Sequence, residues 1–248
     1  MPLTYDLNMF TDEPFIIFGS DHLIALGLIF ISIIIIPYLV LTLKEETQNV
    51  ISTSLALLIL LNEFSKPIYY PALYPDYFSI LKILPLHFCH LSAICAAIFL
   101  LSRKKIFFEI SFFWGIAGGL IANTQPDIRF AFPDPNFILF FFGHGLMWLG
   151  IFFSLIVYKV RPYFKTFIKI FFITVFLSPV VYSINSFINY FAEGDPANYW
   201  YLMARPDGAS IADFLPDPPA QIPIFVLLAF IIFALIYTPF AVWDKLKK

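Results

Sequence analysis

Cys89 and His144 are residues whose types could carry out covalent chemistry together. A cysteine thiol becomes a nucleophile when a base removes its proton, and histidine is a common base. Cys89 lies 14 residues before Arg103, and His144 lies 15 residues before Lys159. If both segments are helical, each residue lies about 21 to 22 Å from the basic end of its helix, at 1.5 Å per residue. This matching depth predicts that the thiol and the imidazole can meet and act as a nucleophile and its base.

Several other polar residues fall at a similar estimated depth in otherwise apolar segments. A carboxylate there could orient a catalytic imidazole, and other polar groups could hydrogen-bond an oxyanion. Polar groups in a membrane core are costly and usually face the interior of a helix bundle. We therefore expect one polar cavity in the outer leaflet, with the orienting and oxyanion candidates Asn62, Glu63, Asn123, Asn185 and His90.

Each of these residues also has an ordinary interpretation. A lone His or Asn in a membrane helix is often only a hydrogen-bonding group between helices. Glu63 is three residues before Lys66, so the two side chains can pair with each other. A metal site is a further alternative, whose ligands would be His87, His90, His144 and either Cys89 or Glu63. The spacing does not single out a metal, and we expect neither a metal nor another cofactor.

Two arginines lie in predicted loops above this cavity, at Arg129 and Arg205. A guanidinium group suits a phosphate headgroup because it can donate two parallel hydrogen bonds. Ordinary loop capping and turn chemistry is the alternative for both residues.

The composition excludes several classes of protein. Of the 248 residues, 60% are hydrophobic and only 13% are charged, and the mean hydropathy is +0.84. Soluble domains carry roughly 25% charged residues. The chain is therefore not expected to be a soluble domain, a disordered chain or a nucleic-acid-binding protein. It is expected to be a polytopic membrane protein.

The two cysteines do not form a disulfide framework. Cys89 and Cys95 are six residues apart in one apolar segment. On a helix they would be roughly 9 Å apart along the axis, whereas a disulfide needs Cα atoms within about 7 Å. We expect Cys95 to be a small apolar core residue.

The apolar segments predict an all-α fold with one integral membrane domain over residues 1–248. A helix needs about 20 predominantly apolar residues to cross a bilayer. Seven segments meet this requirement, at about 22–43, 50–70, 79–101, 106–124, 136–158, 168–190 and 222–243.

The distribution of basic residues predicts the orientation of the chain. If the N-terminus is outside, eleven Lys and Arg residues lie on the cytoplasmic side and three lie outside. Such an excess is the usual mark of cytoplasmic loops. The prediction is a multi-pass protein of the plasma membrane with its N-terminus outside and its C-terminus in the cytoplasm.

Four short stretches resemble a known group of membrane proteins: residues 84–92 (LPLHFCHLS), 112–115 (FFWG), 126–127 (PD) and 142–145 (FGHG). They resemble the YwaF-type bacterial integral membrane proteins, which are similar in turn to the eukaryotic transmembrane protein 164 family. More distantly, they resemble the androgen-induced hydrolases of fatty-acid esters of hydroxy fatty acids. The resemblance spans residues 15–240 and is strongest in the third to fifth predicted spans.

The resemblance implies a function as well as a fold. Members of the transmembrane protein 164 family are acyltransferases that act on phospholipids, and the implied catalytic residues fall on Cys89 and His144. The expected activity is a phospholipid acyltransferase or acyl hydrolase that works through a thioester. Its partners would be a phospholipid or lysophospholipid substrate and the surrounding membrane lipids. The alternative is a non-catalytic membrane protein that binds a lipid or small molecule, such as a transporter or a sensor.

Overall fold

The computed structural model describes residue 11 and residues 13–73, 81, 83–191, 197–205 and 214–247. Within these ranges the fold is all-helical, and its β-structure is a single isolated bridge between Pro14 and Phe130. The elements are α1 (Ser20–Leu41), α2 (Glu45–Leu73), α3 (Phe88–Ser102), α4 (Lys105–Thr124), α5 (Pro135–Ile156), α6 (Phe164–Phe191), the short 3₁₀ helix η3 (Tyr199–Tyr201) and α7 (Ile222–Leu246).

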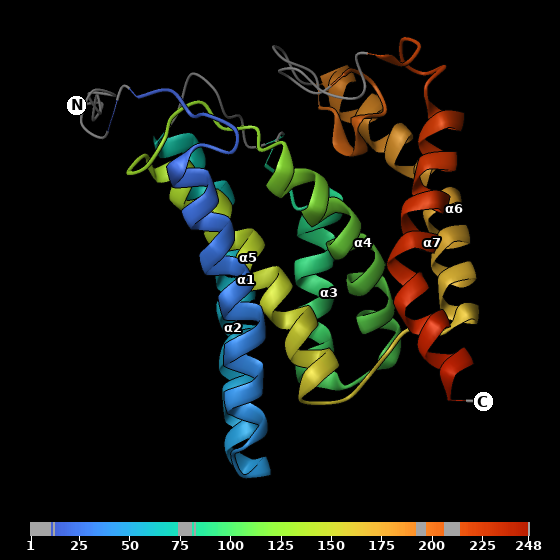
Figure 1. Cartoon of the computed structure of the whole chain (residues 1–248). Helices are drawn as coiled ribbons and strands as arrows, with labels where there is room; N and C mark the ends of the chain where they lie inside the picture. Colours follow the sequence, from blue (N-terminus) through green and yellow to red (C-terminus); the bar gives the residue numbers. More distant parts are fainter. Residues whose placement is uncertain are drawn as a thin grey trace.

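Helices α1 to α5 form one bundle, and α6 and α7 form a pair beside it (Figure 1). In the bundle, α3 packs against α2, α4 and α5, and α1 packs along α5. The α6–α7 pair meets the bundle at α4. The predicted all-α fold is therefore confirmed.

Polar contacts fasten the α6–α7 pair to α4. The carboxylate of Glu109, a buried residue of α4, pairs with Lys169 and accepts a hydrogen bond of 3.1 Å from the Thr166 hydroxyl. Higher on the same helices, Trp114 Nε1 donates to Thr174 Oγ1 at 2.7 Å. These contacts fix the place of the α6–α7 pair, and therefore of the η3 segment that joins its two helices.

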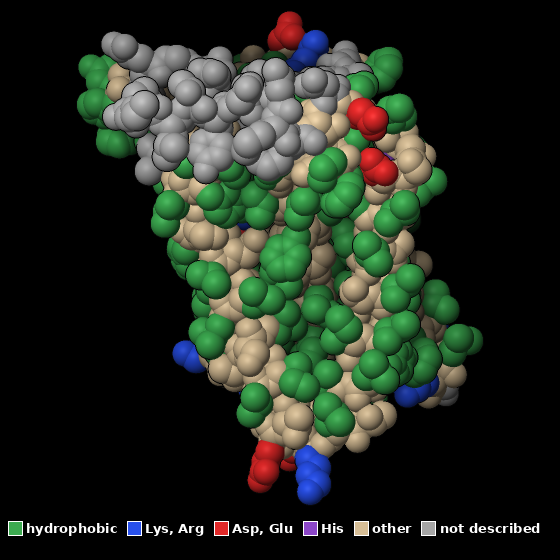
Figure 2. All heavy atoms as spheres, turned by 90° about the vertical axis from the view of Figure 1, so that its left-hand side faces the viewer, with side chains coloured by type: hydrophobic (Ala, Val, Ile, Leu, Met, Phe, Trp, Pro, Cys, Tyr) green, Lys and Arg blue, Asp and Glu red, His purple; other side chains and the backbone are tan. Residues whose placement is uncertain are grey.

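The surface of the helices is apolar over most of their length. Figure 2 shows hydrophobic side chains along the helices, with Lys, Arg, Asp and Glu mostly towards the two ends. Within the part of the chain that the structure describes, five helices are long and apolar enough to cross a membrane, namely α1, α4, α5, α6 and α7. The chain is thus a multi-pass membrane protein, whereas the seven-span count, the orientation and the plasma membrane stay predictions.

The predicted start of the third span is wrong. It was expected over 79–101, but α3 begins only at Phe88, and residues 79, 80 and 82 lie outside the described ranges. With 15 residues, α3 is about 22 Å long, which is less than the roughly 30 Å of the hydrocarbon core. Helix α2 is longer, with 29 residues, but it carries Glu63 and Lys66 inside it.

The late start of α3 follows from Pro85. Proline has no backbone N–H, and it disfavours helical geometry at the preceding residue. A tight turn forms instead, in which Leu86 N donates to Leu84 O at 2.7 Å. Two carbonyl groups of this segment accept hydrogen bonds from η3: Tyr199 Oη donates to Leu81 O, and Trp200 Nε1 donates to Leu86 O at 2.9 Å. Irregular backbone at membrane depth is tolerated where protein groups satisfy it in this way.

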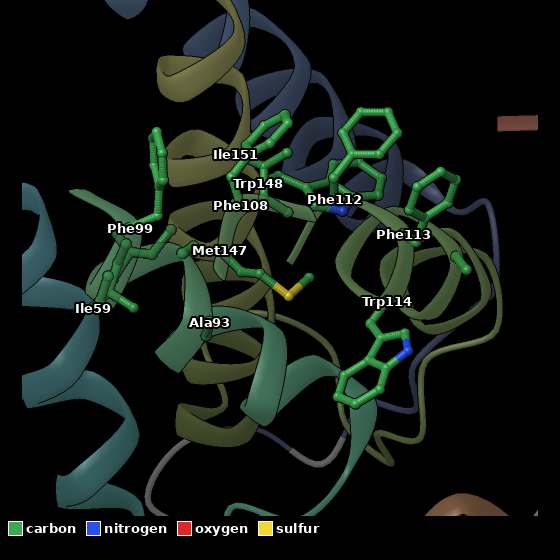
Figure 3. Packing of buried hydrophobic residues seen from close by; sticks show 14 of the residues in the cluster. Ile59, Ala93, Phe99, Phe108, Phe112, Phe113, Trp114, Met147, Trp148 and Ile151 are labelled. Carbon is green, nitrogen blue, oxygen red and sulfur yellow. The ribbon is translucent and has the colours of Figure 1, made fainter. Parts of the chain in front are cut away.

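The core of the bundle lies where α3, α4 and α5 meet (Figure 3). Small residues let these helices approach closely, as is common in membrane helix packing. Gly119 of α4 packs against Trp148 of α5, whose Nε1 donates to Gly115 O at 2.9 Å, and Gly115 itself packs against Ile151 and Ser92. A Cβ atom at Gly119 would lie only 2.3 Å from Trp148 Nε1, so this contact requires glycine.

We predict that Gly119→Ala lowers the thermal stability of the protein in detergent. The added methyl group must displace the rigid Trp148 ring and its hydrogen bond, and overpacking of this kind costs about 1 to 3 kcal/mol. The matched control is Gly27→Ala, because a Cβ atom there meets nothing within 4 Å. Equal melting temperatures for the two variants would contradict the prediction.

Candidate functional site

A buried carboxylate on α2 gathers three donors from α2 and α3. Glu63 Oε1 accepts hydrogen bonds from Lys66 Nζ at 2.6 Å and from Asn62 Nδ2 at 3.2 Å. Glu63 Oε2 lies 2.6 Å from His90 Nδ1 on α3. We call Asn62, Glu63, Lys66 and His90 the polar cluster.

The members of the polar cluster differ in accessibility. The side chain of Glu63 is 2% exposed and that of Lys66 is 10% exposed, whereas His90 is 23% exposed. A buried carboxylate is tolerable only when it is paired and hydrogen-bonded, and Glu63 meets both conditions. His90 is therefore the member of the ion-paired group that a substrate could reach.

A glycine of helix α5 packs against the polar cluster. A Cβ atom at Gly143 would lie 3.2 Å from Asn62 Nδ2 and 3.6 Å from Lys66 Nζ. The next residue is His144, whose Nδ1 donates to Phe140 O at 2.8 Å. A carbonyl oxygen only accepts, so this bond places the proton on Nδ1 and leaves a lone pair on Nε2.

Cys89 lies in the first turn of α3, directly after the N-cap residue His87 and Phe88. No side chain caps this helix, and no described residue accepts a hydrogen bond from the N–H groups of Phe88, Cys89 or His90. Free N–H groups and the helix dipole make such an end favourable for negative charge. Helix α4 leaves room for the thiol, since a Cβ atom at Gly118 would lie 3.1 Å from Cys89 Sγ.

Cys89 and His144 share a neighbourhood without a direct bond. Among the described residues no hydrogen bond joins the Cys89 thiol to the His144 ring. Cys89 directly precedes His90 of the polar cluster, and His144 directly follows Gly143, which packs against Asn62 and Lys66. Glu63, which was expected to orient the imidazole of His144, binds His90 instead.

Asn123 and Asn185 have partners in the scaffold. Asn185 of α6 holds the backbone of η3, because its Nδ2 donates to Tyr199 O and its Oδ1 accepts from Tyr199 N, each at 2.9 Å. Asn123 Nδ2 donates to Gly119 O at 2.8 Å, and His22 Nε2 donates to Asn123 O at 2.8 Å. Neither amide has a hydrogen bond to the polar cluster, so the structure divides the expected single polar level into separate groups.

The two arginines are held within the loops. Arg205 pairs with Asp217 Oδ1 at 3.1 Å and donates to Leu215 O at 2.7 Å. The carbonyl group of Arg129 accepts a hydrogen bond from Phe15 N at 2.9 Å. Headgroup binding by either arginine stays a prediction.

Residues of η3 also contribute to the site, although they were not among the predicted catalytic or orienting residues. The Trp200 ring stacks on Phe88 with ring centroids 4.0 Å apart, and Tyr199 contacts the His87 ring at 5.0 Å. Burial raises the pKa of the Tyr199 phenol to about 12, so this group keeps its proton and its hydrogen bond to Leu81 O near neutral pH. The loop between α6 and α7 therefore supports the start of α3.

Lys66 belongs to the site, although it was not among the predicted site residues. Its position three residues after Glu63 gave the pairing as one alternative, and the 2.6 Å contact confirms that alternative. Within the described ranges, no group of three or more His, Cys, Asp or Glu side chains is arranged to hold a metal ion. The metal alternative therefore finds no support in the donor geometry.

We predict that Glu63→Ala destabilises the protein strongly, because it leaves the Lys66 ammonium buried without a counter-charge. Breaking a buried pair in this way costs about 3 to 5 kcal/mol. The double variant Glu63→Gln with Lys66→Met removes both charges and should recover most of the loss. Thermal unfolding in detergent measures both effects, and a single variant as stable as the parent would refute the prediction.

Comparison with known proteins gives one match. No curated protein and no solved structure matches the chain. The model of the TMEM164 family matches residues 17–237, which include α1 to α6 in full and both Cys89 and His144. The chain belongs to the TMEM164 family.

Proposed function

We propose that the protein is a membrane-embedded phospholipid acyltransferase or acyl hydrolase in which Cys89 forms a thioester with the acyl group. The observation that carries the proposal is the position of Cys89 in the uncapped first turn of α3. A thiolate there gains from the helix dipole, and nearby N–H groups of the same turn can stabilise an oxyanion. The resemblance described above independently implies the same residue.

His144 suits the role of the base. The hydrogen bond from its Nδ1 to Phe140 O fixes the ring orientation and leaves Nε2 able to accept a proton. Its ring also packs on Phe140, with centroids 4.3 Å apart. The absence of a bond to Cys89 does not exclude this role, since catalytic hydrogen bonds often tighten only when substrate binds.

The first half-reaction then balances without an added reactant. His144 Nε2 takes the thiol proton, and the Cys89 thiolate attacks the ester carbonyl carbon of a phospholipid. When the intermediate collapses, the ester C–O bond breaks, and the lysophospholipid alkoxide receives the proton from His144. A hydroxyl acceptor or water releases the acyl group in the second half-reaction. With the basic helix ends in the cytoplasm, this chemistry would take place in the outer leaflet of the plasma membrane.

A non-catalytic lipid or small-molecule binder is the second candidate. One observation favours it, namely that α3 has only 15 residues and begins partway along a segment that the sequence predicts to span the membrane. Half-helices of this kind bind anionic groups in transporters. A binder would need no covalent step, so a search for the thioester separates the two candidates.

We predict an acyl adduct on Cys89 after the purified protein is incubated with vesicles of mixed phospholipids. Intact-protein mass spectrometry should show an acyl mass that hydroxylamine removes. The adduct should be absent from Cys89→Ala, because the nucleophile is lost. It should form at least about 100-fold more slowly in His144→Ala, in line with the usual contribution of a general base.

Cys95→Ala is the matched control, because Cys95 lies on the same helix six residues further along. It should acquire the adduct at the rate of the parent protein. If no form of the protein acquires an adduct or releases lysolipid or fatty acid, the enzyme proposal fails and the binder takes its place.

A further inference from the structure

The imidazole of His90 is hydrogen-bonded to the Glu63 carboxylate, an arrangement suited to proton transfer, but the first half-reaction does not use it. The inference drawn from it rests on the proposed thioester chemistry and concerns the second half-reaction. In that step a hydroxyl group must attack the thioester. An alcohol is a much weaker acid than a thiol, so this attack needs a base more than the first step does.

The hydrogen bonds of the polar cluster fix the proton of His90. Lys66 Nζ lies 2.6 Å from Glu63 Oε1, and this contact keeps Glu63 an ionised acceptor. An ionised carboxylate cannot donate, so the 2.6 Å bond between His90 Nδ1 and Glu63 Oε2 carries the imidazole proton on Nδ1. Nε2 of His90 is left with its lone pair, and no described residue bonds to it.

This arrangement is a carboxylate–histidine dyad. In such dyads the carboxylate holds the ring in one tautomer and stabilises the imidazolium that forms when Nε2 takes a proton. His144 has a neutral carbonyl oxygen in the same place. Lys66 Nζ also lies 3.2 Å from His90 Nδ1, so Glu63 serves both the ammonium and the imidazole, and what His90 has beyond His144 is an anionic partner for its Nδ1.

The placement of His90 also fits a base that meets a second substrate. It follows Cys89 directly and belongs to the same uncapped turn of α3. Its side chain is 23% exposed, whereas the side chain of Glu63, which binds it, is only 2% exposed. On an ideal helix the two neighbours differ by about 100° in direction, so an acyl group on Cys89 and a hydroxyl group at His90 need not compete for one space.

We propose that His90 is the general base that activates the acceptor hydroxyl of a lysophospholipid, and that Glu63 positions it. His90 Nε2 takes the hydroxyl proton as the oxygen attacks the thioester carbonyl carbon. The C–S bond then breaks, and the Cys89 thiolate leaves and is protonated by the proton that His90 received. A new ester and a free thiol remain, both histidines end neutral, and no other reactant is consumed.

The test separates the two half-reactions in the full-length protein. p-Nitrophenyl oleate serves as the donor, since its leaving group needs no proton and the acyl protein accumulates. The acyl protein is then exposed either to 1-oleoyl-lysophosphatidylglycerol or to hydroxylamine, which is a neutral nucleophile that does not require a base. The fate of the thioester is followed by intact-protein mass spectrometry, and the new phospholipid is followed by lipid mass spectrometry.

We predict that His90→Asn acquires the acyl group within about threefold of the parent rate and loses it to hydroxylamine at the same rate. Transfer to the lysophospholipid should fall by about 100-fold, the lower end of the usual contribution of a general base. Asn can still donate to Glu63, which keeps the ion pair of the polar cluster intact. His90→Gln is the second variant and should show the same division.

His87→Phe is the matched control, because a phenyl ring keeps the aromatic packing and cannot cap the first turn of α3 as Asn could. His87 precedes the same turn, with its ring 6.2 Å from that of His90, but it packs against Tyr199 and Tyr201 and has no bond to Glu63. It should match the parent in all three measurements. Transfer to the lysophospholipid within threefold of the parent in both His90 variants would overturn the proposal.

An equal fall of all three rates in both His90 variants would also overturn it, because that result would show a structural role only. If the parent protein acquires no acyl group, the proposed function itself fails. The failure of the thioester and the failure of the His90 assignment are therefore distinguishable.

Discussion

The site depends on one constraint, which is that the backbone on either side of Pro85, before α3 begins, must be hydrogen-bonded although it is not α-helical. Pro85 prevents α3 from starting earlier, and this leaves carbonyl groups in an apolar setting where each unsatisfied one is costly. Donors from η3 meet that need, and Asn185 in turn holds η3 to α6. The α6–α7 pair thus supports the first turn of α3, although it contributes no residue to the polar cluster.

The polar cluster is better understood as a positioning device than as a source of stability. Replacing a buried ion pair by apolar residues is often neutral or stabilising, so the Glu63–Lys66 pair is weak evidence for a stabilising role. Its effect is to fix the charge on Glu63 and hence the direction in which His90 points. The glycine at position 143 lets α5 approach this cluster closely, which brings His144 to its border.

Hydropathy predicted most of the fold, because a long apolar helix can be identified from its own residues without knowing which helices pack against it. It failed at α3, where the run of residues from 79 to 101 is predominantly apolar but the helix begins at Phe88. Pro85 was visible in the sequence, yet the donors that make the break tolerable come from residues more than 100 positions away. The estimated depth in the membrane likewise did not predict the partners of Asn123 and Asn185, because residues at one depth can face different neighbours. Spacing did identify the Glu63–Lys66 pair as an alternative, since residues three apart on a helix are adjacent whatever the fold.

The two histidines beside Cys89 differ in what their Nδ1 groups contact, and this difference orders their chemistry. A carbonyl acceptor, as for His144, fixes a tautomer but adds no charge to stabilise an imidazolium. A carboxylate acceptor, as for His90, also adds a negative charge, which it shares with the Lys66 ammonium 3.2 Å from the same Nδ1. A thiol is a much stronger acid than an alcohol, so the imidazole held by a carbonyl group suffices for Cys89, whereas the alcohol step needs the one held by a carboxylate. A chain with Cys89 and His144 alone could therefore acylate itself, and the dyad on α2 and α3 provides the feature that favours transfer to an alcohol.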